Sequence, residues 1–261
     1  MREELFHIIL GILIPFLGTT IGAGCVFFVQ KEIKPVIQKM LLGFASGIMV
    51  AASVWSLLIP AMEMCEPAGK LAFVPAAAGF SIGIVFLWVL DKLIPHLHMG
   101  SDTPEGPKSN LKKTTMLVFA VTLHNLPEGM VVGLAAALAL HGDADAVSGA
   151  LALSLGIGLQ NIPEGAAVSL PLTQSGHTRG QSFAAGAASG LVEPLGAVLA
   201  FVLAEWVGAA LPWLMSAAAG CMVCVTAQEM IPEAVEPDEV AGVISIVLGF
   251  ALMMALDVAL G

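Results

Sequence analysis

The chain has 261 residues, of which 57% are hydrophobic and only 11% are charged, and its formal net charge is -10. A soluble domain carries about a quarter charged residues, so this composition excludes an ordinary soluble protein and indicates an integral membrane protein with several spans. The longest basic cluster is a pair of lysines, which excludes a nucleic-acid-binding surface, and the four cysteines form no recognisable disulfide framework.

Eight apolar segments are long enough to cross a bilayer, which requires about 20 apolar residues per helix. Their hydrophobicity is continuous rather than alternating, which predicts helices instead of a β-barrel. Their abundant Gly and Ala are typical of helices that pack closely in lipid. The first segment is too long and too acidic at its start to resemble a cleaved signal peptide. In chain order the predicted helices are roughly 5–29, 40–62, 71–90, 115–140, 147–171, 182–204, 208–231 and 240–260, within one transmembrane domain of residues 1–261.

The placement of Lys and Arg predicts which helix ends face the cytoplasm. Basic residues gather in the connections after the first, third and fifth helices, whereas the opposite side has only Arg2 and Lys70. Because cytoplasmic loops carry the excess of Lys and Arg, both termini are predicted to lie outside. The connection 95–113 is polar with Gly and Pro, which predicts a mobile cytoplasmic loop. Its His96 and His98 are candidate ligands for a soft metal, although short histidine tracts are more often ordinary solvated loop residues.

The fourth predicted helix contains the hexapeptide HNLPEG, which begins at His124. His124 lies four residues before Glu128 and Asn125 lies three residues before it, so all share one helix face. Pro127 has no N–H group, so it frees the carbonyl of Leu123 and kinks the helix. The motif therefore predicts a polar, locally opened face inside an apolar span.

The fifth predicted helix repeats this pattern as QNIPEG. Gln160 and Asn161 share a face with Glu164, and Pro163 frees the carbonyl of Leu159. Consecutive spans run antiparallel, so the two motifs are expected to lie side by side. Their approach would bring together two carboxylates, one imidazole and three amides.

Two carboxylates in an apolar setting predict a cation site. A charged side chain at the bilayer centre costs roughly 2.5–3.5 kcal/mol. Glu128 and Glu164 would also repel each other unless a divalent cation or a shared proton lay between them. Bridging by both glutamates would suit two metal ions, and a single ion would also fit. The alternative, in which each Pro-Glu pair only kinks its helix, does not account for two copies with His, Gln and Asn in register.

The donor types narrow the choice of ion. One imidazole with carboxylate and amide oxygens suits Zn²⁺, Fe²⁺, Mn²⁺ or Cd²⁺ better than Ca²⁺ or Mg²⁺, which prefer oxygen alone. Such a mixed shell also binds more weakly than a structural Cys/His zinc site, which suits an ion that must be released. The sequence therefore predicts the ion as a bound substrate and no resident cofactor.

Other polar residues in or near the spans are candidates for the path of the ion. Glu193 lies well inside the sixth helix and is followed by Pro194. Met49 in the second helix could offer a thioether, although a Met in an apolar helix usually packs. Glu63 ends the second helix on the outer side, and the candidates near the cytoplasmic ends are Asp91, Gln228 and Glu229.

A weaker internal repeat relates the second and seventh helices. The segment ASGIMV…IPAME (Ala45–Glu63) resembles AAGCMV…IPEAVE (Ala218–Glu236). The two helices run in opposite directions, so helices one to three would be an inverted copy of helices six to eight around the central pair. Inverted repeats are typical of transporters whose site lies near the midplane.

These motifs resemble a known family. The chain resembles the ZIP (Zrt/Irt-like) divalent metal transporters in three motifs, which are HNLPEG on the fourth helix, QNIPEG on the fifth and SGLVEPLGA on the sixth. The second motif begins with Gln160 instead of a histidine, and this looks most like the GufA-like branch of the family. The resemblance covers the whole chain. It implies an all-α bundle of eight transmembrane helices in a 3+2+3 inverted-repeat arrangement. It also implies a homodimer in the cell (inner or plasma) membrane that moves Zn²⁺ inward by alternating access.

The resemblance further implies a binuclear metal centre midway across the membrane. The implied primary site consists of His124, Glu128, Gln160 and Glu164, and the second site adds Asn125, Asn161 and Glu193, with both hexapeptide glutamates bridging. Met49 matches a thioether ligand on the second helix, and Ser56 matches the outer pathway. Glu63 matches an acidic entrance, and Asp91, Gln228 and Glu229 lie along the implied exit.

Two other classes of protein remain as alternatives. An intramembrane zinc metalloprotease would need two histidines four residues apart with a glutamate beside the first, and His124 is followed by Asn125 instead. The chain is therefore not expected to be an enzyme. A proton-linked transporter of another solute could use the carboxylates, but it gives no reason for the register of His, Gln and Asn.

Overall fold

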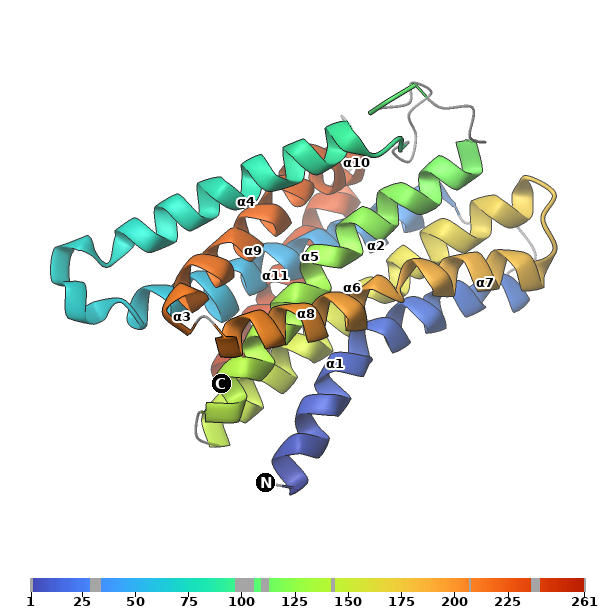
Figure 1. Cartoon of the computed structure of the whole chain (residues 1–261). Coiled ribbons are helices and arrows are strands. Elements are labelled where there is room, and N and C mark those ends of the chain that lie inside the picture. Colours follow the sequence, from blue (N-terminus) through green and yellow to red (C-terminus); the bar gives the residue numbers. More distant parts are fainter. Residues whose placement is uncertain are drawn as a thin grey trace.

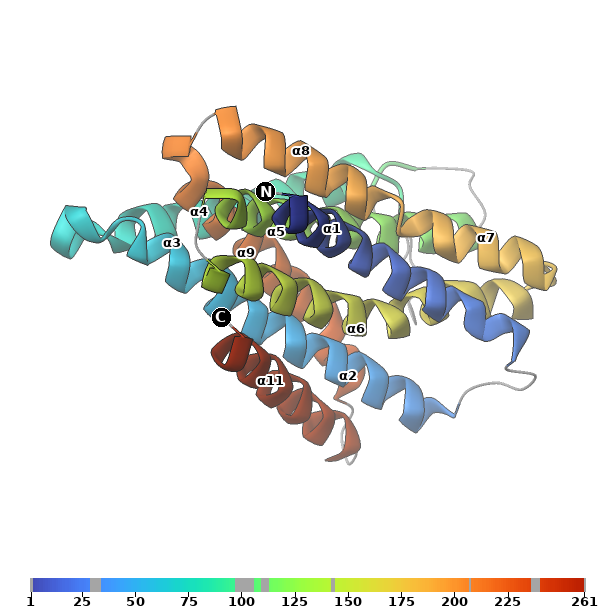
Figure 2. The same ribbon diagram turned by 90° about the horizontal axis from the view of Figure 1, so that it is seen from below.

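The computed structural model describes residues 2–28, 34–96, 106–108, 113–141, 144–206, 208–235 and 240–260. The regular elements in these ranges are helices that pack into one bundle (Figure 1), which confirms the predicted all-α class. Both termini lie at the same end of the bundle as the short helix α3 (Ile59–Glu63) in Figures 1 and 2. The membrane face to which that end belongs stays a prediction. Much of the predicted mobile connection 95–113, including His98, lies outside the described residues.

The first five spans are built from residues 2–174. α1 (Arg2–Ala23) continues into the 3-10 turn η1 (Gly24–Phe27). The second span consists of α2 (Pro35–Ala52), the π-helical turn η2 (Ser53–Leu58) and α3. A 3-10 segment η3 (Glu66–Leu71) leads into α4 (Phe73–Leu93), and the central helices are α5 (Lys113–His141) and α6 (Ala144–Gln174).

The second half contains the remaining spans, two of which are made of several helical pieces. α7 (Arg179–Ser189) and α8 (Val192–Trp206) form the sixth span. The seventh consists of α9 (Leu211–Val225), the π-helical turn η5 (Thr226–Met230) and α10 (Ile231–Ala234), preceded by the 3-10 turn η4 (Gly208–Ala210). The last span is α11 (Val240–Leu260).

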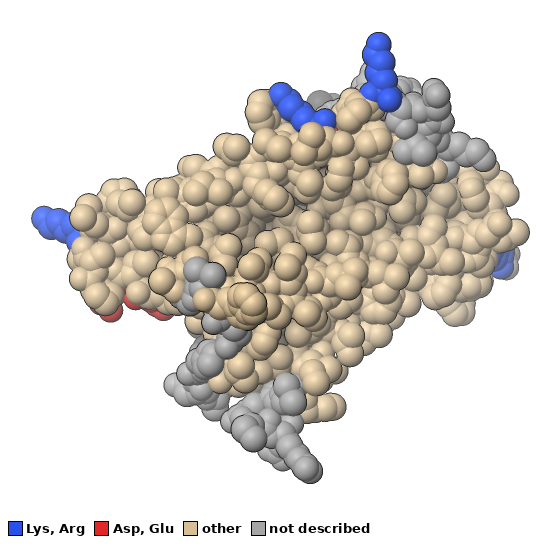
Figure 3. Space-filling model, in the orientation of Figure 1, with Lys and Arg blue, Asp and Glu red and all other residues tan. Residues whose placement is uncertain are grey.

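Eight of the described helical spans are long and apolar enough to cross a membrane, which confirms the predicted number. The second span begins at Pro35, earlier than predicted, because proline fits the first turn of a helix, where no N–H donor is needed. Figure 3 shows one face of the molecule. The Lys, Arg, Asp and Glu side chains visible there lie at the edges of this face, and uncharged residues cover its middle. The chain is a multi-pass membrane protein.

Close backbone contacts at glycines join the helices in four pairs. A Cβ atom at Gly22 of α1 would overlap the carbonyl oxygen of Ile162 in α6, and one at Gly133 of α5 would overlap that of Ala197 in α8. Gly47 of α2 meets α11 in the same way, and Gly83 of α4 meets α9. Glycine is needed at such positions because any side chain would push the backbones apart. These contacts explain the glycine content of the spans.

Substitution of Gly22 by alanine is expected to destabilise the protein by about 1–3 kcal/mol, because the added methyl group overpacks the contact between α1 and α6. Thermal unfolding of the purified protein in detergent would show this as a lower Tm. Gly24 provides the matched control, since a Cβ there would meet nothing within 4 Å. Equal melting temperatures for Gly22→Ala and Gly24→Ala would contradict the close backbone contact.

The two π-helical turns each precede an Ile-Pro pair. η2 leads into Ile59–Pro60 and η5 leads into Ile231–Pro232. Proline removes one N–H donor from a helix, and the wider π turn accommodates the interrupted hydrogen-bond ladder. The two turns occupy corresponding places in the two segments that the sequence relates, while their relation as an inverted repeat stays a prediction.

Candidate metal centre

The central helices α5 and α6 bring the two hexapeptides into contact. The side-chain amide of Gln160 donates to Oε1 of Glu128 at 2.7 Å, from Nε2. Both side chains are completely buried. The structure thus joins a carboxylate of one motif to an amide of the other, at the level where the prolines interrupt both helices.

The two asparagines of the hexapeptides direct their side-chain nitrogen atoms at backbone carbonyl groups. Nδ2 of Asn125 donates to the carbonyl oxygen of Ser189 at 3.1 Å, and Nδ2 of Asn161 donates to that of Pro15 at 3.5 Å. A backbone carbonyl can only accept, so it fixes which amide atom faces it. Both Oδ1 atoms are therefore turned away from these partners.

Six buried oxygen atoms from the two motifs and Glu193 have no hydrogen-bond partner among the residues that the structure describes. Each comes from a different side chain, and all are acceptors in the ionised carboxylate and amide forms. Buried acceptors without donors are costly unless a proton or a cation satisfies them. The atoms are Oδ1 of Asn125, Oε2 of Glu128, Oε1 of Gln160, Oδ1 of Asn161, Oε2 of Glu164 and Oε2 of Glu193. We call this set the oxygen cluster.

Glu193 reaches the centre from the first turn of α8. Its Oε1 accepts a hydrogen bond from the hydroxyl of Thr19 at 2.6 Å, and both side chains are completely buried. A Cβ atom at Gly129 would overlap the backbone of Glu193, so α8 lies directly against the turn of α5 that follows Glu128. The predicted third intramembrane carboxylate therefore stands beside the first hexapeptide.

His124 lies at the edge of the centre, where its Nε2 is 3.3 Å from Oε1 of Glu229. The two side chains are only 15% and 16% exposed. Glu229 belongs to η5, so this contact joins α5 to the seventh span. Among the described residues, no three side chains of His, Cys, Asp or Glu stand close enough together to form a metal-binding group. The imidazole thus contacts the predicted exit residue.

Comparison with known proteins gives the family. The family described as ZIP Zinc transporter matches residues 113–257. The human zinc transporter ZIP11 is 32% identical, in a match that covers 100% of this chain and 99% of the relative. The chain belongs to the ZIP family. Its resemblance to these transporters is thus confirmed, as is the prediction that the chain is not an enzyme.

Bacterial ZIP proteins are similar to this ZIP protein at comparable levels. The zinc transporter GufA of Myxococcus xanthus is 36% identical over 94% of this chain and 96% of the relative. The zinc transporter ZIPB of Bordetella bronchiseptica is 35% identical over 100% of this chain and 83% of the relative. The matched region therefore extends over the whole transmembrane bundle.

The predicted path residues of this ZIP protein lie at different depths. Met49 is buried in α2, with its sulfur 3.6 Å from the hydroxyl of Thr226. Ser56 in η2 donates to the carboxylate of Asp257 at 2.9 and 3.1 Å. Glu63 is exposed at the end of α3.

The remaining path candidates lie near the ends of α4 and η5. Asp91 is partly buried in the last turn of α4, and Gln228 is exposed beside the partly buried Glu229. His96 is completely buried, and its Nδ1 is 2.8 Å from the carbonyl oxygen of Ile94. That ring therefore packs against the end of α4 instead of standing free in solvent.

Two side chains in these contacts were missed by the sequence reasoning. Asp257 could have been found, because it is an acidic residue in an otherwise apolar span, where such residues are usually functional. Thr19 gave no such signal, since a threonine inside a helix most often bonds to its own backbone.

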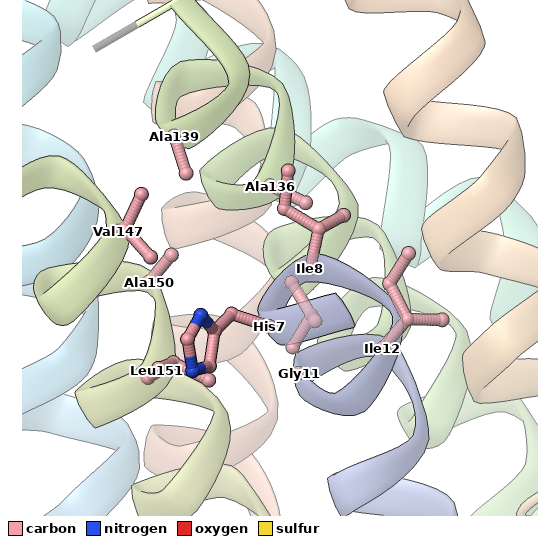
Figure 4. Close-up of a pocket in the computed structure, with 10 residues that line it drawn as sticks. His7, Ile8, Gly11, Ile12, Ala136, Ala139, Val147, Ala150 and Leu151 are labelled. Carbon is pink, nitrogen blue, oxygen red and sulfur yellow. The ribbon is translucent and has the colours of Figure 1, made fainter. Parts of the chain in front are cut away.

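A separate small pocket lies between α1, α5 and α6. Its lining is almost entirely apolar, and none of the predicted site residues contributes to it. Figure 4 shows His7 among Ile8, Ala150 and Leu151 in this region. The pocket therefore has no donor set for a metal ion and is distinct from the oxygen cluster.

Proposed function

We propose that this ZIP protein moves zinc into the cytoplasm through a binuclear site near the membrane midplane. The observation that carries the proposal is the oxygen cluster, in which buried acceptors from two hexapeptides and Glu193 have no donor within the described ranges. A divalent cation satisfies several such oxygens at once and offsets the repulsion between carboxylates. We propose zinc as the ion because these relatives are described as zinc transporters.

The proposed ligands divide between two positions. Glu128 and Glu164 bridge both ions; His124 and Gln160 complete the primary position, and Asn125, Asn161 and Glu193 complete the second. In the structure Nε2 of His124 contacts Glu229, and we propose that the ring exchanges this contact for the primary position. We propose that this exchange accompanies loading and release, because Glu229 lies on the proposed exit path.

The mixed donor set favours transition-metal ions over calcium or magnesium. One imidazole among carboxylate and amide oxygens accepts Zn²⁺, and Cd²⁺, Fe²⁺ or Mn²⁺ would also fit. Gln160 occupies the position opposite His124, and Asn161 carries no charge, so the shell is less soft and less negative than a site of two histidines and an added aspartate. We propose that this moderate affinity permits release.

Alternating access is proposed between two groups of helices. The first group contains α1, α5, α6, α7 and α8, and the second contains α2, α3, α4, α9, α10 and α11. The glycine contacts with neighbouring backbones, such as Gly22 with Ile162 and Gly83 with Ala217, join helices within a group. Gly156 of α6 faces the second group, where it meets the flexible end of Met253. This pattern supports movement of one group relative to the other, because side-chain contacts rearrange more easily than close backbone contacts.

The proposed path runs from Glu63 past Ser56 and its partner Asp257 to the oxygen cluster. It continues from the cluster past Glu229 and Gln228 to Asp91. We propose that the thioether of Met49 is a ligand for the ion beside this path. We further propose a homodimer in the cell membrane, with the lysine-rich connections in the cytoplasm.

Zinc uptake by the purified protein in liposomes tests this function. A zinc indicator and a pH indicator enclosed in the vesicles would report both fluxes after zinc is added outside. We expect zinc to enter faster than in protein-free liposomes, with Cd²⁺ competing. Proton flux without zinc flux would favour a proton-linked carrier of another solute. Absence of zinc flux in vesicles that hold folded protein would contradict the proposal.

A further inference from the structure

The hydroxyl of Thr19 makes its short contact with a carboxylate rather than with its own helix. Oγ1 lies 2.6 Å from Oε1 of Glu193 and 3.4 Å from the carbonyl oxygen of Pro15. A hydroxyl has a single hydrogen to donate, so the shorter contact receives it. Hydrogen bonds to ionised acceptors are shorter and roughly twice as strong as those between neutral groups.

The same turn of α1 holds a second residue of the oxygen cluster. The carbonyl oxygen of Pro15 accepts from Nδ2 of Asn161 at 3.5 Å. Residues Pro15 and Thr19 are four apart and lie on one face of α1. This turn therefore contacts Asn161 from α6 and Glu193 from α8, which are two of the three side chains that only the second metal position uses.

Backbone contacts fix this turn relative to α6. Cβ atoms at Gly18 and Gly22 of α1 would overlap carbonyl oxygens of α6, and one at Gly165 of α6 would overlap that of Thr19. Since the helices are in direct backbone contact, α1 cannot shift without α6. The hydroxyl of Thr19 is thus held in place before any ion arrives.

We propose that Thr19 is a positioning residue for the second metal position. Its hydroxyl donates to Oε1 of Glu193, so that carboxylate meets the ion through Oε2, for which the described part of the chain offers no hydrogen-bond donor. Glu193 thereby acts as a ligand through one oxygen, with its side chain already oriented. This inference rests on the proposed function, and it adds a residue of α1 to a centre otherwise built from α5, α6 and α8.

The hydroxyl group of Thr19 makes the hydrogen bond and its methyl group packs, so the two effects can be tested separately. A Cβ atom at Gly190 would lie 2.8 and 2.9 Å from Cβ and Cγ2 of Thr19, so the carbon atoms of Thr19 pack against the turn between α7 and α8. Thr19→Val keeps this packing and removes the hydrogen bond. Thr19→Ser keeps the hydrogen bond and removes the methyl group. The pair therefore separates positioning from packing.

Cadmium binding to the full chain in lipid nanodiscs tests the proposal. Calorimetric titration of the unaltered protein is expected to show two binding events, of which Glu193→Gln identifies the one at the second position. Thr19→Val is expected to weaken that same event about tenfold, as measured for partners that orient metal ligands, and to leave the other within about twofold. Thr19→Ser should match the unaltered protein in both events.

Thr173→Val is the matched control, because the hydroxyl of Thr173 bonds to the carbonyl oxygen of Ser169 within α6 at 3.1 Å. If Thr19→Val does not fold, Thr19→Ala provides the same comparison against Thr19→Ser. Unchanged binding in Thr19→Val, while Glu193→Gln loses one event, would overturn the role of Thr19 alone. No bound cadmium in the unaltered protein would overturn the proposed function itself.

Discussion

Replacing Glu128 or Glu164 with glutamine is expected to reduce zinc uptake into liposomes more than about 100-fold. Each change removes a negative charge from the oxygen cluster and puts an amide donor where the ion needs an acceptor. Loss of a residue that merely orients a metal ligand costs 10- to 100-fold, so the loss of a bridging ligand should cost more. The measurement is the initial rate of the enclosed zinc indicator.

The matched control is Glu66→Gln, since Glu66 is an exposed glutamate in η3 that contributes no atom to the oxygen cluster. Its uptake rate should stay within about twofold of the unaltered protein. Gln and Glu are similar in size, so all three variants should keep the melting temperature of the unaltered protein to within a few degrees. Uptake at full rate by folded Glu128→Gln and Glu164→Gln would exclude the oxygen cluster as the transport site.

The helical bundle could be predicted because hydrophobicity acts over whole segments. A run of about 20 apolar residues has one stable form in lipid, which is a helix with its backbone hydrogen bonds satisfied internally. The approach of the two hexapeptides was also predictable in outline, because consecutive spans are antiparallel neighbours. The structure adds the bond between Gln160 and Glu128, which depends on how far each helix is rotated.

Contacts between distant spans were not predictable from local patterns. Thr19 and Glu193 are 174 residues apart, and no periodicity in either helix predicts so distant a partner. The contact of His124 with Glu229 likewise joins two spans that are distant in the sequence. Similarly, the sequence identified Asn125 and Asn161 as polar, but only the carbonyl groups of Ser189 and Pro15 decide that their oxygens remain available.

A disulfide between the two helix groups is expected to stop zinc uptake. The side-chain end of Met253 of α11 fills the space where a Cβ atom at Gly156 of α6 would lie, so cysteines at these two positions would face each other across the boundary between the groups. The double variant Gly156→Cys and Met253→Cys would be made after the native cysteines are replaced by alanine. Oxidation should reduce uptake to the rate of protein-free liposomes, and reduction should restore it.

A disulfide within one group provides the control for this experiment. A Cβ atom at Gly11 of α1 would lie 3.8 Å from Cβ of Ser154 in α6, which matches the separation in natural disulfides. Oxidised Gly11→Cys with Ser154→Cys should retain uptake to within about twofold, because α1 and α6 move together. If both disulfides form fully and uptake continues through each, the ion passes without relative movement of the groups. A block by both would instead place the boundary of movement between α1 and α6, which their close backbone contacts oppose.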